Sequence, residues 1–292
     1  MKKFINDPDL VVDEGLEGFL LAHGDRVRRL ETSRVVVRRD LVEGKVGLVT
    51  GGGSGHKPAF LGFTGAGMFD AVVVGEVFTS PTAAAVLEAI EAVDTGAGVL
   101  LLLGTYAGDG MNFRLGADLA REKGHQVELS ISTDDVGAGF HDEPQKRRGV
   151  VGSFLLWKAC GARAEEGATL TELRDLADRV NSVTRTMGVA LTPCTVPAVG
   201  RPTFTLEEEE MELGVGHHGE RGTRTVPLAP VDEVVDILAE EVIKDLPFQA
   251  GDEVATLING LGGTPQIELY IAHRRLAQVL ADRGIVIRHQ LV

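Results

Sequence analysis

A histidine at the end of a glycine-rich stretch is the first residue of this sequence that could carry out chemistry. Residues 46–50 are mostly apolar and lead into residues 51–56, which read GGGSGH. We expect a buried strand that ends in a tight loop, where the missing side chains let another group approach the backbone. The stretch lacks the Lys-Ser or Lys-Thr of a phosphate loop and the Gly-x-Gly-x-x-Gly dinucleotide spacing. The pattern is consistent with proton transfer by His56 to a small polar substrate, and equally with a structural turn that carries an exposed histidine.

Two further stretches follow apolar runs in the same way. Residues 75–81 read GEVFTSP, and residues 104–110 read GTYAGDG. If the three preceding strands are parallel, their carboxyl ends share one edge of the sheet, which is where such sheets bind ligands. This arrangement would bring His56 and Asp109 together. A carboxylate orients a nearby imidazole and favours its protonated form, so the two residues could act as a general acid/base pair.

The same residue types also have structural uses. Asp109 lies between two glycines and could simply cap the next helix, which is the commoner role of aspartate in such a loop. Ser80 could donate a hydrogen bond to a substrate, or it could cap the helix expected to begin at Pro81. The spacing leaves both alternatives open.

A second unusual stretch, residues 214–222, reads GVGHHGERG. Adjacent histidines such as His217 and His218 point in different directions on a strand or loop, and no third ligand is clearly placed nearby. We therefore expect no metal site here. The sequence leaves two interpretations, a reactive imidazole in a loop opened by glycines and an ordinary exposed loop.

Apolar runs of strand length alternate with stretches of helical spacing along the chain. Strands are expected at residues 34–38, 46–50, 71–74, 99–103, 127–131, 253–258 and 285–287. Helices are expected at residues 14–23, 82–93, 113–123, 152–162, 170–183, 231–246 and 267–283. This alternation predicts an α/β fold with mostly parallel or mixed sheets flanked by helices. We expect two α/β domains, residues 1–184 with the glycine-rich stretch and residues 185–292 with the paired histidines.

Composition narrows the class of protein. A length of 292 residues fits about two domains, and 43% hydrophobic residues supply ample core. The net charge of −14 argues against nucleic acid or an anionic membrane as a partner, and no apolar run approaches membrane-spanning length. Two cysteines without metal-ligand spacing indicate a reducing compartment, so we expect a cytoplasmic protein. The basic triplet 146–148 is typical of a solvated loop end.

Seven separated motifs, taken together, resemble the substrate-binding K subunit of dihydroxyacetone kinases. They occur in that family's order and span the chain from near residue 14 to its end. The motifs are GGGSGH at 51–56, GEVFTSP at 75–81, Tyr106 with Gly108 and Asp109, MNF at 111–113, RTMGVAL at 185–191, the stretch 214–220, and NGLGGTP at 259–265.

The resemblance implies a fold of two α/β domains and roles for individual residues. His218 matches the histidine that holds a short ketose covalently as a hemiaminal. His56 and Asp109 match the acid/base residues around the bound triose. The expected substrate-binding residues are Gly53, Ser54, Gly55, His56, Ser80, Asp109 and His218.

The resemblance also implies what the chain works with. It implies a homodimer, and it implies that this chain binds no cofactor itself. The phosphoryl donor would be ATP, or ADP recharged by a phosphotransferase protein, held with Mg²⁺ on a separate L subunit. The expected activity is that of a dihydroxyacetone (glycerone) kinase subunit. Such chemistry selects molecules with a carbonyl, because a neutral imidazole can add to a ketone and present its terminal hydroxyl for phosphorylation.

Some residues depart from the family pattern. Lys57, Phe60, Gly104 and Ala107 stand where glutamate, histidine, lysine and threonine are common. These changes alter charge and space at the edge of the pocket, so a four-carbon ketose such as erythrulose competes with dihydroxyacetone as the substrate. The chain also ends earlier than we expect for the family, at Val292. A non-catalytic ketose sensor that serves a transcriptional regulator is the alternative from a different functional class.

Overall fold

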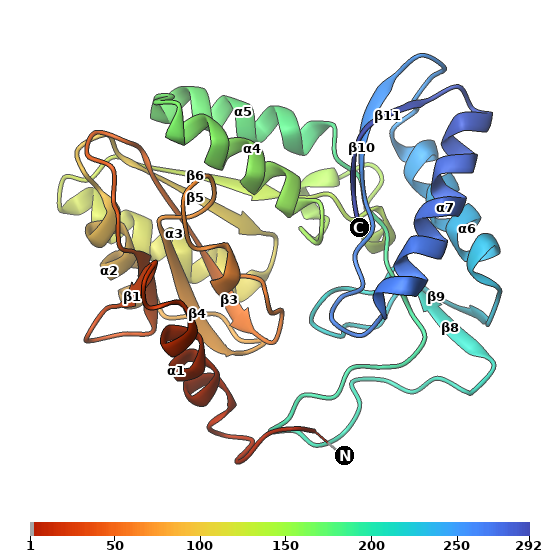
Figure 1. Ribbon diagram of the computed structural model, residues 1–292, viewed down its shortest axis with the longest axis horizontal. Helices are drawn as coiled ribbons and strands as arrows, with labels where there is room; N and C mark the ends of the chain where they lie inside the picture. Colours follow the sequence, from red (N-terminus) through yellow and green to blue (C-terminus); the bar gives the residue numbers. More distant parts are fainter. Residues whose placement is uncertain (1–2) are drawn as a thin grey trace. The chain divides into compact units, whose positions relative to one another are not determined.

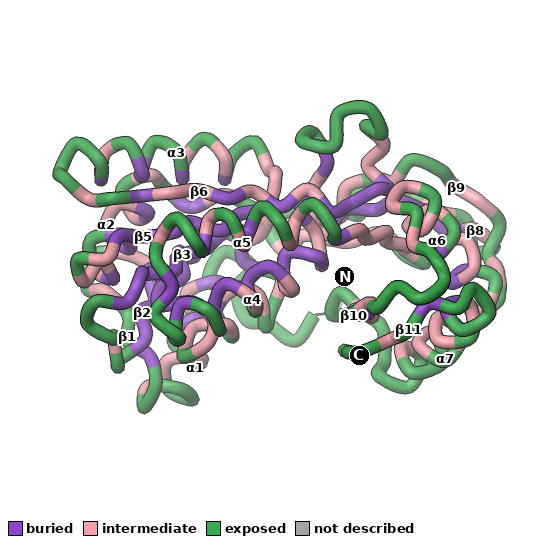
Figure 2. The backbone as a smooth tube through the Cα atoms, turned by 90° about the horizontal axis from the view of Figure 1, so that it is seen from above, coloured by how far each residue is buried: buried purple, intermediate pink, exposed green. Residues whose placement is uncertain are grey.

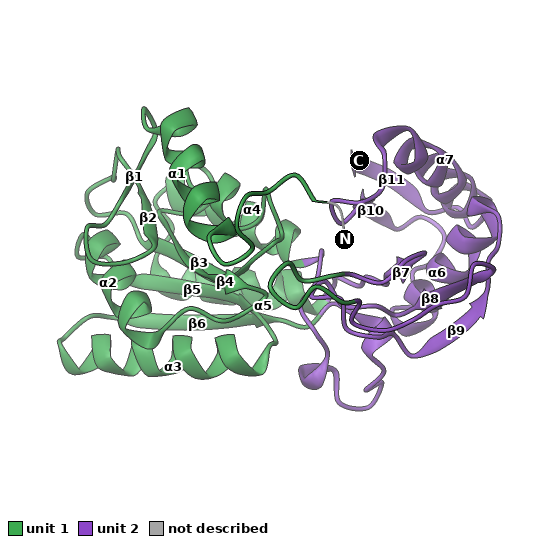
Figure 3. Cartoon of the chain, turned by 90° about the horizontal axis from the view of Figure 1, so that it is seen from below, with its two compact units in different colours: residues 1–133, 153–182, 195–201 green, residues 134–152, 183–194, 202–292 purple. Residues whose placement is uncertain are grey.

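The computed structural model describes residues 3–292 and forms two compact units. Unit 1 holds the chain up to Thr133 together with Ser153–Ser182 and Thr195–Arg201. Unit 2 holds Asp134–Gly152, Val183–Cys194 and Pro202–Val292 (Figure 3). The units therefore interleave along the chain, whereas the sequence suggested one boundary between residues 184 and 185. The boundary between residues 184 and 185 stays a prediction of where two independently folding domains meet.

Unit 1 is built around a six-stranded sheet with the order β1-β2-β4-β3-β5-β6. Strands β4, β3, β5 and β6 pair in parallel, while β1 and β2 continue the sheet by antiparallel pairing. Both faces of the central strands are covered, since every residue of β2 and β3 is buried. The strands are β1 Val27–Arg29, β2 Val35–Arg38, β3 Gly47–Ser54, β4 Ala71–Val77, β5 Val99–Gly104 and β6 Val127–Ser132.

Helices pack on both faces of this sheet (Figure 1). Side chains alternate across β5, so that Leu100 and Leu102 join the core under α1, α4 and α5, and Leu101 joins the core under α2 and α3. The burial pattern follows the same layers, with buried strands and exposed outer sides of α3 and α5 (Figure 2). The helices are α1 Val11–His23, α2 Ala83–Val93, α3 Ala107–Glu122, α4 Ser153–Glu165 and α5 Leu170–Ser182.

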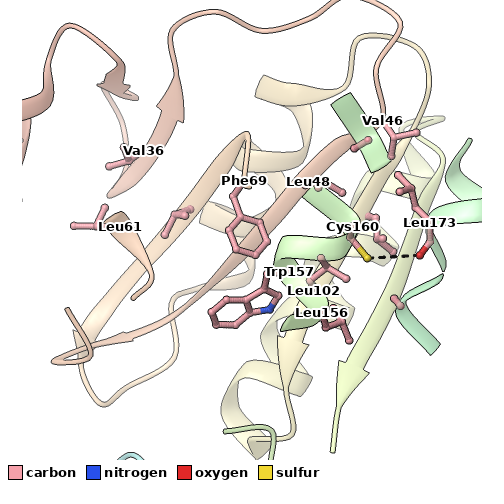
Figure 4. Packing of buried hydrophobic residues seen from close by; sticks show 14 of the residues in the cluster. Val36, Val46, Leu48, Leu61, Phe69, Leu102, Leu156, Trp157, Cys160 and Leu173 are labelled. Carbon is pink, nitrogen blue, oxygen red and sulfur yellow. Dashed lines mark hydrogen bonds between the residues drawn. The ribbon is translucent and has the colours of Figure 1, made fainter. Parts of the chain in front are cut away.

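An aromatic cluster anchors α4 to the sheet. Trp157 packs against Phe69, with ring centroids 5.5 Å apart, and lies beside Leu48 and Leu102 of the strands (Figure 4). Aromatic pairs of this geometry contribute about 0.5–1.5 kcal/mol beyond their buried area. The same tryptophan contacts Phe60, at 5.6 Å between centroids, and so connects this core to the glycine-rich stretch.

Two loops expected from the sequence are parts of regular elements instead. Gly51 to Ser54 continue β3, because β4 comes so close that a Cβ on Gly51 would lie 2.3 Å from the carbonyl oxygen of Val73. Only a glycine permits that approach. Asp109 lies in the first turn of α3, which begins at Ala107 rather than at residue 113. The sequence missed this turn because two of its residues are glycines, which disfavour helix.

Unit 2 combines an antiparallel sheet, a parallel strand pair and two long helices. Strands β7 Val189–Ala190, β8 Glu210–Leu213 and β9 Arg224–Pro227 pair antiparallel, and β10 Glu253–Leu257 pairs in parallel with β11 Val286–Leu291. The helices are α6 Val231–Asp245 and α7 Gln266–Asp282, and short 3₁₀ turns lie at Val136–Ala138 and Pro144–Lys146. A third such turn, Leu61–Phe63, belongs to unit 1. Together the two units confirm the expected α/β class with parallel and mixed sheets flanked by helices.

The segment Asp134–Gly152 is fixed to unit 2 by buried charges. Arg147, only 1% exposed, donates two hydrogen bonds to Asp245 at 2.8 and 2.5 Å, and Arg185 donates a third to the same carboxylate. The basic triplet is therefore not a solvated loop end, since Arg147 is buried against a carboxylate distant in sequence. Burial opposes ionisation, but the hydrogen bonds from both arginines hold the pKa of Asp245 well below its usual value.

No helix among residues 3–292 combines the length and the apolar character needed to cross a membrane.

Candidate functional site

Unit 1 places its candidate residues where β3 and β5 end. The two strands are adjacent and parallel, so the end of the glycine stretch and the start of α3 lie at one edge of the sheet, as expected. The carboxylate of Asp109 lies beside Gly52, whose missing Cβ would be 3.5 Å from Oδ2. A carboxylate in the first turn of a helix is stabilised by the helix dipole, and Asp109 is 8% exposed.

His56 is half-buried and contacts two aromatic rings. Its ring centroid is 4.9 Å from that of Phe78, with an interplanar angle of 33°, and 5.9 Å from that of Phe60, at 79°. The first ring is tilted over the imidazole and the second meets it edge-on. No local sequence pattern indicates this pair of contacts, because Phe60 and Phe78 come from different segments.

The four other predicted residues of unit 1 contact the protein itself. Ser54 is 6% exposed, and its Oγ donates to the carbonyl of Gly75 at 2.9 Å, which ties β3 to β4. Ser80 accepts a hydrogen bond from Asn112 at 3.2 Å and donates one to the carbonyl of Pro81. It does not cap the following helix, because Thr82 does so by accepting from the amide of Ala85. Gly53 and Gly55 both lie against Phe78.

Unit 2 carries the paired histidines on the loop between β8 and β9. The rings of His217 and His218 meet edge-on, with centroids 4.4 Å apart. Glu220 holds His218 at two points: it accepts from the backbone amide at 2.9 Å, and its other oxygen lies 3.4 Å from Nδ1. Burial raises the pKa of Glu220, but the hydrogen bonds with His218 outweigh it and keep that pKa below the usual value. An anionic Glu220 favours the tautomer with a proton on Nδ1, which leaves the lone pair on Nε2.

An arginine and an aspartate of the same unit support this loop. Arg148 donates to the carbonyl of Gly214 at 2.6 Å and to Asp135 at 2.8 Å. Desolvation raises the pKa of Asp135 to about 6, although the neighbouring Arg148 lowers it. A Cβ on Gly216 would lie 2.1 Å from Glu220 Oε2 and 2.8 Å from Arg148 Nη1. Glycine at that position therefore lets Glu220 reach His218. Neither Asp135 nor Arg148 stands out in the sequence as part of the site, because Arg148 reaches Gly214 across 66 positions of chain.

The chain is similar to known proteins over its whole length. The Dak1 domain model matches residues 17–292. The dihydroxyacetone-binding subunit DhaK of PTS-dependent dihydroxyacetone kinase 1 from Listeria innocua is 44% identical over 292 residues, which cover 100% of this chain and 89% of that protein.

Two solved structures extend the comparison. The dihydroxyacetone kinase operon co-activator Dha-DhaQ superposes with a TM-score of 0.91 at 30% identity, over 97% of this chain and 87% of that one. The dihydroxyacetone kinase from C. freundii, in complex with AMP-PNP and Mg²⁺, superposes with a TM-score of 0.87 at 37% identity, over 97% of this chain and 52% of that one.

Proposed function

Because this chain belongs to the Dak1 domain family, we propose that it is the dihydroxyacetone-binding subunit of a dihydroxyacetone kinase, a phosphotransferase that acts on an alcohol group. The identity of 44% over the whole chain with a DhaK subunit supports the assignment. The single observation that carries the chemistry is the pair of contacts from Glu220 to His218, since they prepare one nitrogen of an imidazole for attack on a carbonyl carbon.

His218 is the proposed covalent anchor. Its Nε2 lone pair attacks the carbonyl carbon of the ketose, a C–N bond forms, and the carbonyl π bond opens to an alkoxide. The ring gains positive charge in this step, which the carboxylate of Glu220, 3.4 Å from Nδ1, stabilises. Loss of the Nδ1 proton and protonation of the alkoxide then give a neutral hemiaminal. The overall step needs no external oxidant, reductant or additional proton.

His56 and Asp109 are the proposed acid/base residues for the ketose hydroxyl. Removing the proton from that hydroxyl makes its oxygen a better nucleophile toward the phosphorus of the donor. Positioning and electrostatic stabilisation supply most of the catalysis in phosphoryl transfer. The backbone at Gly53 and Gly55 is proposed as the wall of the triose pocket, with Ser80 as a further polar contact.

The phosphoryl donor is proposed to belong to a partner. A nucleotide with Mg²⁺, or a nucleotide recharged by a phosphotransferase protein, would be held by an L subunit that meets this chain at the bound ketose. The C. freundii kinase, whose chain is about twice as long as the part matched here, was solved with AMP-PNP and Mg²⁺, which supports a donor carried outside the matched region. A homodimer in the cytoplasm completes the proposal.

Adduct formation tests the anchor directly. We would mix the protein with dihydroxyacetone labelled with ¹³C at the carbonyl, and separately with erythrulose, and record native mass spectra and ¹³C NMR. The expected result is one ketose per chain and conversion of the carbonyl signal to that of a tetrahedral carbon. His218→Ala should abolish both signals, and the matched variant His217→Ala should retain them. An adduct that survives in His218→Ala contradicts the anchor.

A ketose-sensing co-activator is the second candidate function, because Dha-DhaQ covers the chain with a TM-score of 0.91. Both functions predict the adduct, so turnover separates them. With an L subunit and a phosphoryl donor that sustain turnover by the L. innocua DhaK, the kinase produces phosphorylated ketose and the sensor produces none.

A further inference from the structure

We propose that Phe78 is a positioning residue for His56, and that residues 53 and 55 are glycines because Phe78 occupies the space of their side chains. The inference rests on the proposed function, because it concerns the proton transfer proposed for His56. Its structural basis lies entirely within unit 1.

The backbone of Phe78 provides the first line of support. Phe78 has a φ of +55°, a left-handed conformation that a bulky residue rarely adopts. Its amide donates to the carbonyl of Ser54 at 2.9 Å, so the chain after β4 is tied to the end of β3. A Cβ on Gly53 would lie 2.5 Å from the Cα of Phe78 and 2.6 Å from the amide nitrogen of Thr79. The unusual backbone of Phe78 and the glycine at 53 therefore depend on each other.

The ring of Phe78 provides the second line of support. A Cβ on Gly55 would lie 2.6 Å from Cε1 of this ring, so the glycine leaves room for the ring to reach the imidazole. His56 then lies 4.9 Å from Phe78 and 5.9 Å from Phe60, measured between centroids. Phe60 is in turn held by the buried Trp157. Two aromatic rings from separate segments thus limit the rotation of the imidazole.

Restricting the imidazole matters because proton transfer requires it to point at one hydroxyl. Geometry of this kind affects the chemical step more than the affinity for substrate. The proposed anchor, His218, belongs to the other unit and is held there by Glu220. We therefore expect loss of the Phe78 ring to lower kcat and to leave the covalent capture of ketose intact.

Three variants separate the ring from the backbone. Phe78→Leu removes the aromatic ring and keeps a side chain with the same backbone strain, while Phe78→Tyr keeps the ring. Phe19→Leu is the matched control, because Phe19 contacts a different histidine, His23, at 4.7 Å between centroids in the same unit. Each variant would be tested for kcat and KM with donor and L subunit, for the ketose adduct by native mass spectrometry, and for the ¹H–¹³C NMR signals of the His56 ring.

Phe78→Leu should lower kcat about tenfold, equivalent to about 1.4 kcal/mol, with KM and adduct changed less than about twofold, a signature of lost transition-state stabilisation. The His56 ring signals should shift as the ring current of Phe78 disappears. Phe78→Tyr and Phe19→Leu should behave like the wild type. An unchanged kcat, unchanged His56 signals, or a parallel loss of adduct and kcat would overturn the inference. If the wild type makes an adduct but no product, the proposed kinase function fails, and the NMR signals still decide whether Phe78 positions His56.

Discussion

Replacing Glu220 by glutamine removes one negative charge beside His218 and nearly preserves the shape of the side chain. Glutamine can still accept the hydrogen bond from the backbone amide of His218, which Glu220 accepts at 2.9 Å. The variant therefore tests the second contact, between Oε1 and Nδ1 at 3.4 Å. This contact is the one that favours a lone pair on Nε2 and stabilises the charge that develops on the ring.

The distance and the exposure set the size of the effect. Two full charges 3.4 Å apart interact by about 5 kcal/mol at an effective dielectric constant of about 20, which is an upper bound. The Glu220 side chain is 35% exposed, and the contact is longer than an ideal hydrogen bond. We therefore take the lower end of the range for hydrogen bonds to charged groups, about 1.5 kcal/mol, which is about tenfold in an equilibrium constant.

The assay is the equilibrium constant for adduct formation with ¹³C-labelled dihydroxyacetone, measured by NMR at neutral pH. We expect it to fall about tenfold in Glu220→Gln. Because the pKa of Glu220 lies below its usual value, the same difference should persist down to mildly acid pH. The exposed Glu208 supplies a control, since Glu208→Gln removes an equal charge away from His218. An adduct constant within about twofold of the wild type in Glu220→Gln, or an equal fall in the control, would refute the role of Glu220.

Other perturbations have outcomes that follow from burial. Gly53→Ala would force a methyl group to 2.5 Å from Phe78 Cα and should cost about 1–3 kcal/mol of unfolding free energy in urea, whereas Gly110→Ala, with open space around its Cβ, should not destabilise. Asp70→Asn would remove the charge of one carboxylate from the buried Arg38 and Lys45, which lie 3.1 and 2.6 Å from it and keep Glu165 as a second acidic partner, and should cost about 1–3 kcal/mol; an unfolding free energy equal to that of the wild type would contradict this. The pKa of Asp135 is raised from 3.8 to about 6, so its protonated form is favoured on folding. The folding stability that the protonated carboxyl of Asp135 contributes is therefore present below pH 4 and is lost as pH rises through about 6. Asp135→Asn should remove about 3 kcal/mol of that pH dependence, measured as unfolding free energies from pH 4 to pH 7 against the wild type.

The regular parts of the fold could be predicted from local patterns. Buried strands such as β5 show as apolar runs, and the parallel order that brings β3 beside β5 follows from their alternation with helices. The first turn of α3 and the last residues of β3 could not be found this way. Both contain glycines, and their conformation is decided by the neighbouring backbone rather than by propensity.

Part of the candidate site could likewise be predicted from the sequence and part of it could not. His56 and Asp109 stand out because they lie in glycine-rich stretches after predicted strands, whereas His218 is singled out within its histidine pair only by the family resemblance. The residues that hold them did not stand out. Phe78 contacts His56 from a backbone position with a φ of +55°, and Arg148 reaches the loop of His218 through the carbonyl of Gly214, 66 positions away in the sequence. Neither a residue with a positive φ nor a contact between distant residues produces a periodic pattern in the sequence.

Because the two units interleave along the chain, a single cut cannot separate them. Arg147 emerges from the ribosome almost a hundred residues before Asp245, the carboxylate that pairs with it in unit 2. At a synthesis rate of about 5–20 residues per second, Arg147 is therefore made several seconds before Asp245. A fragment that stops at residue 184 would contain Arg147 but lack Asp245, so segment Asp134–Gly152 would lose this ion pair with the rest of unit 2. Co-expression of the two halves should restore the pair.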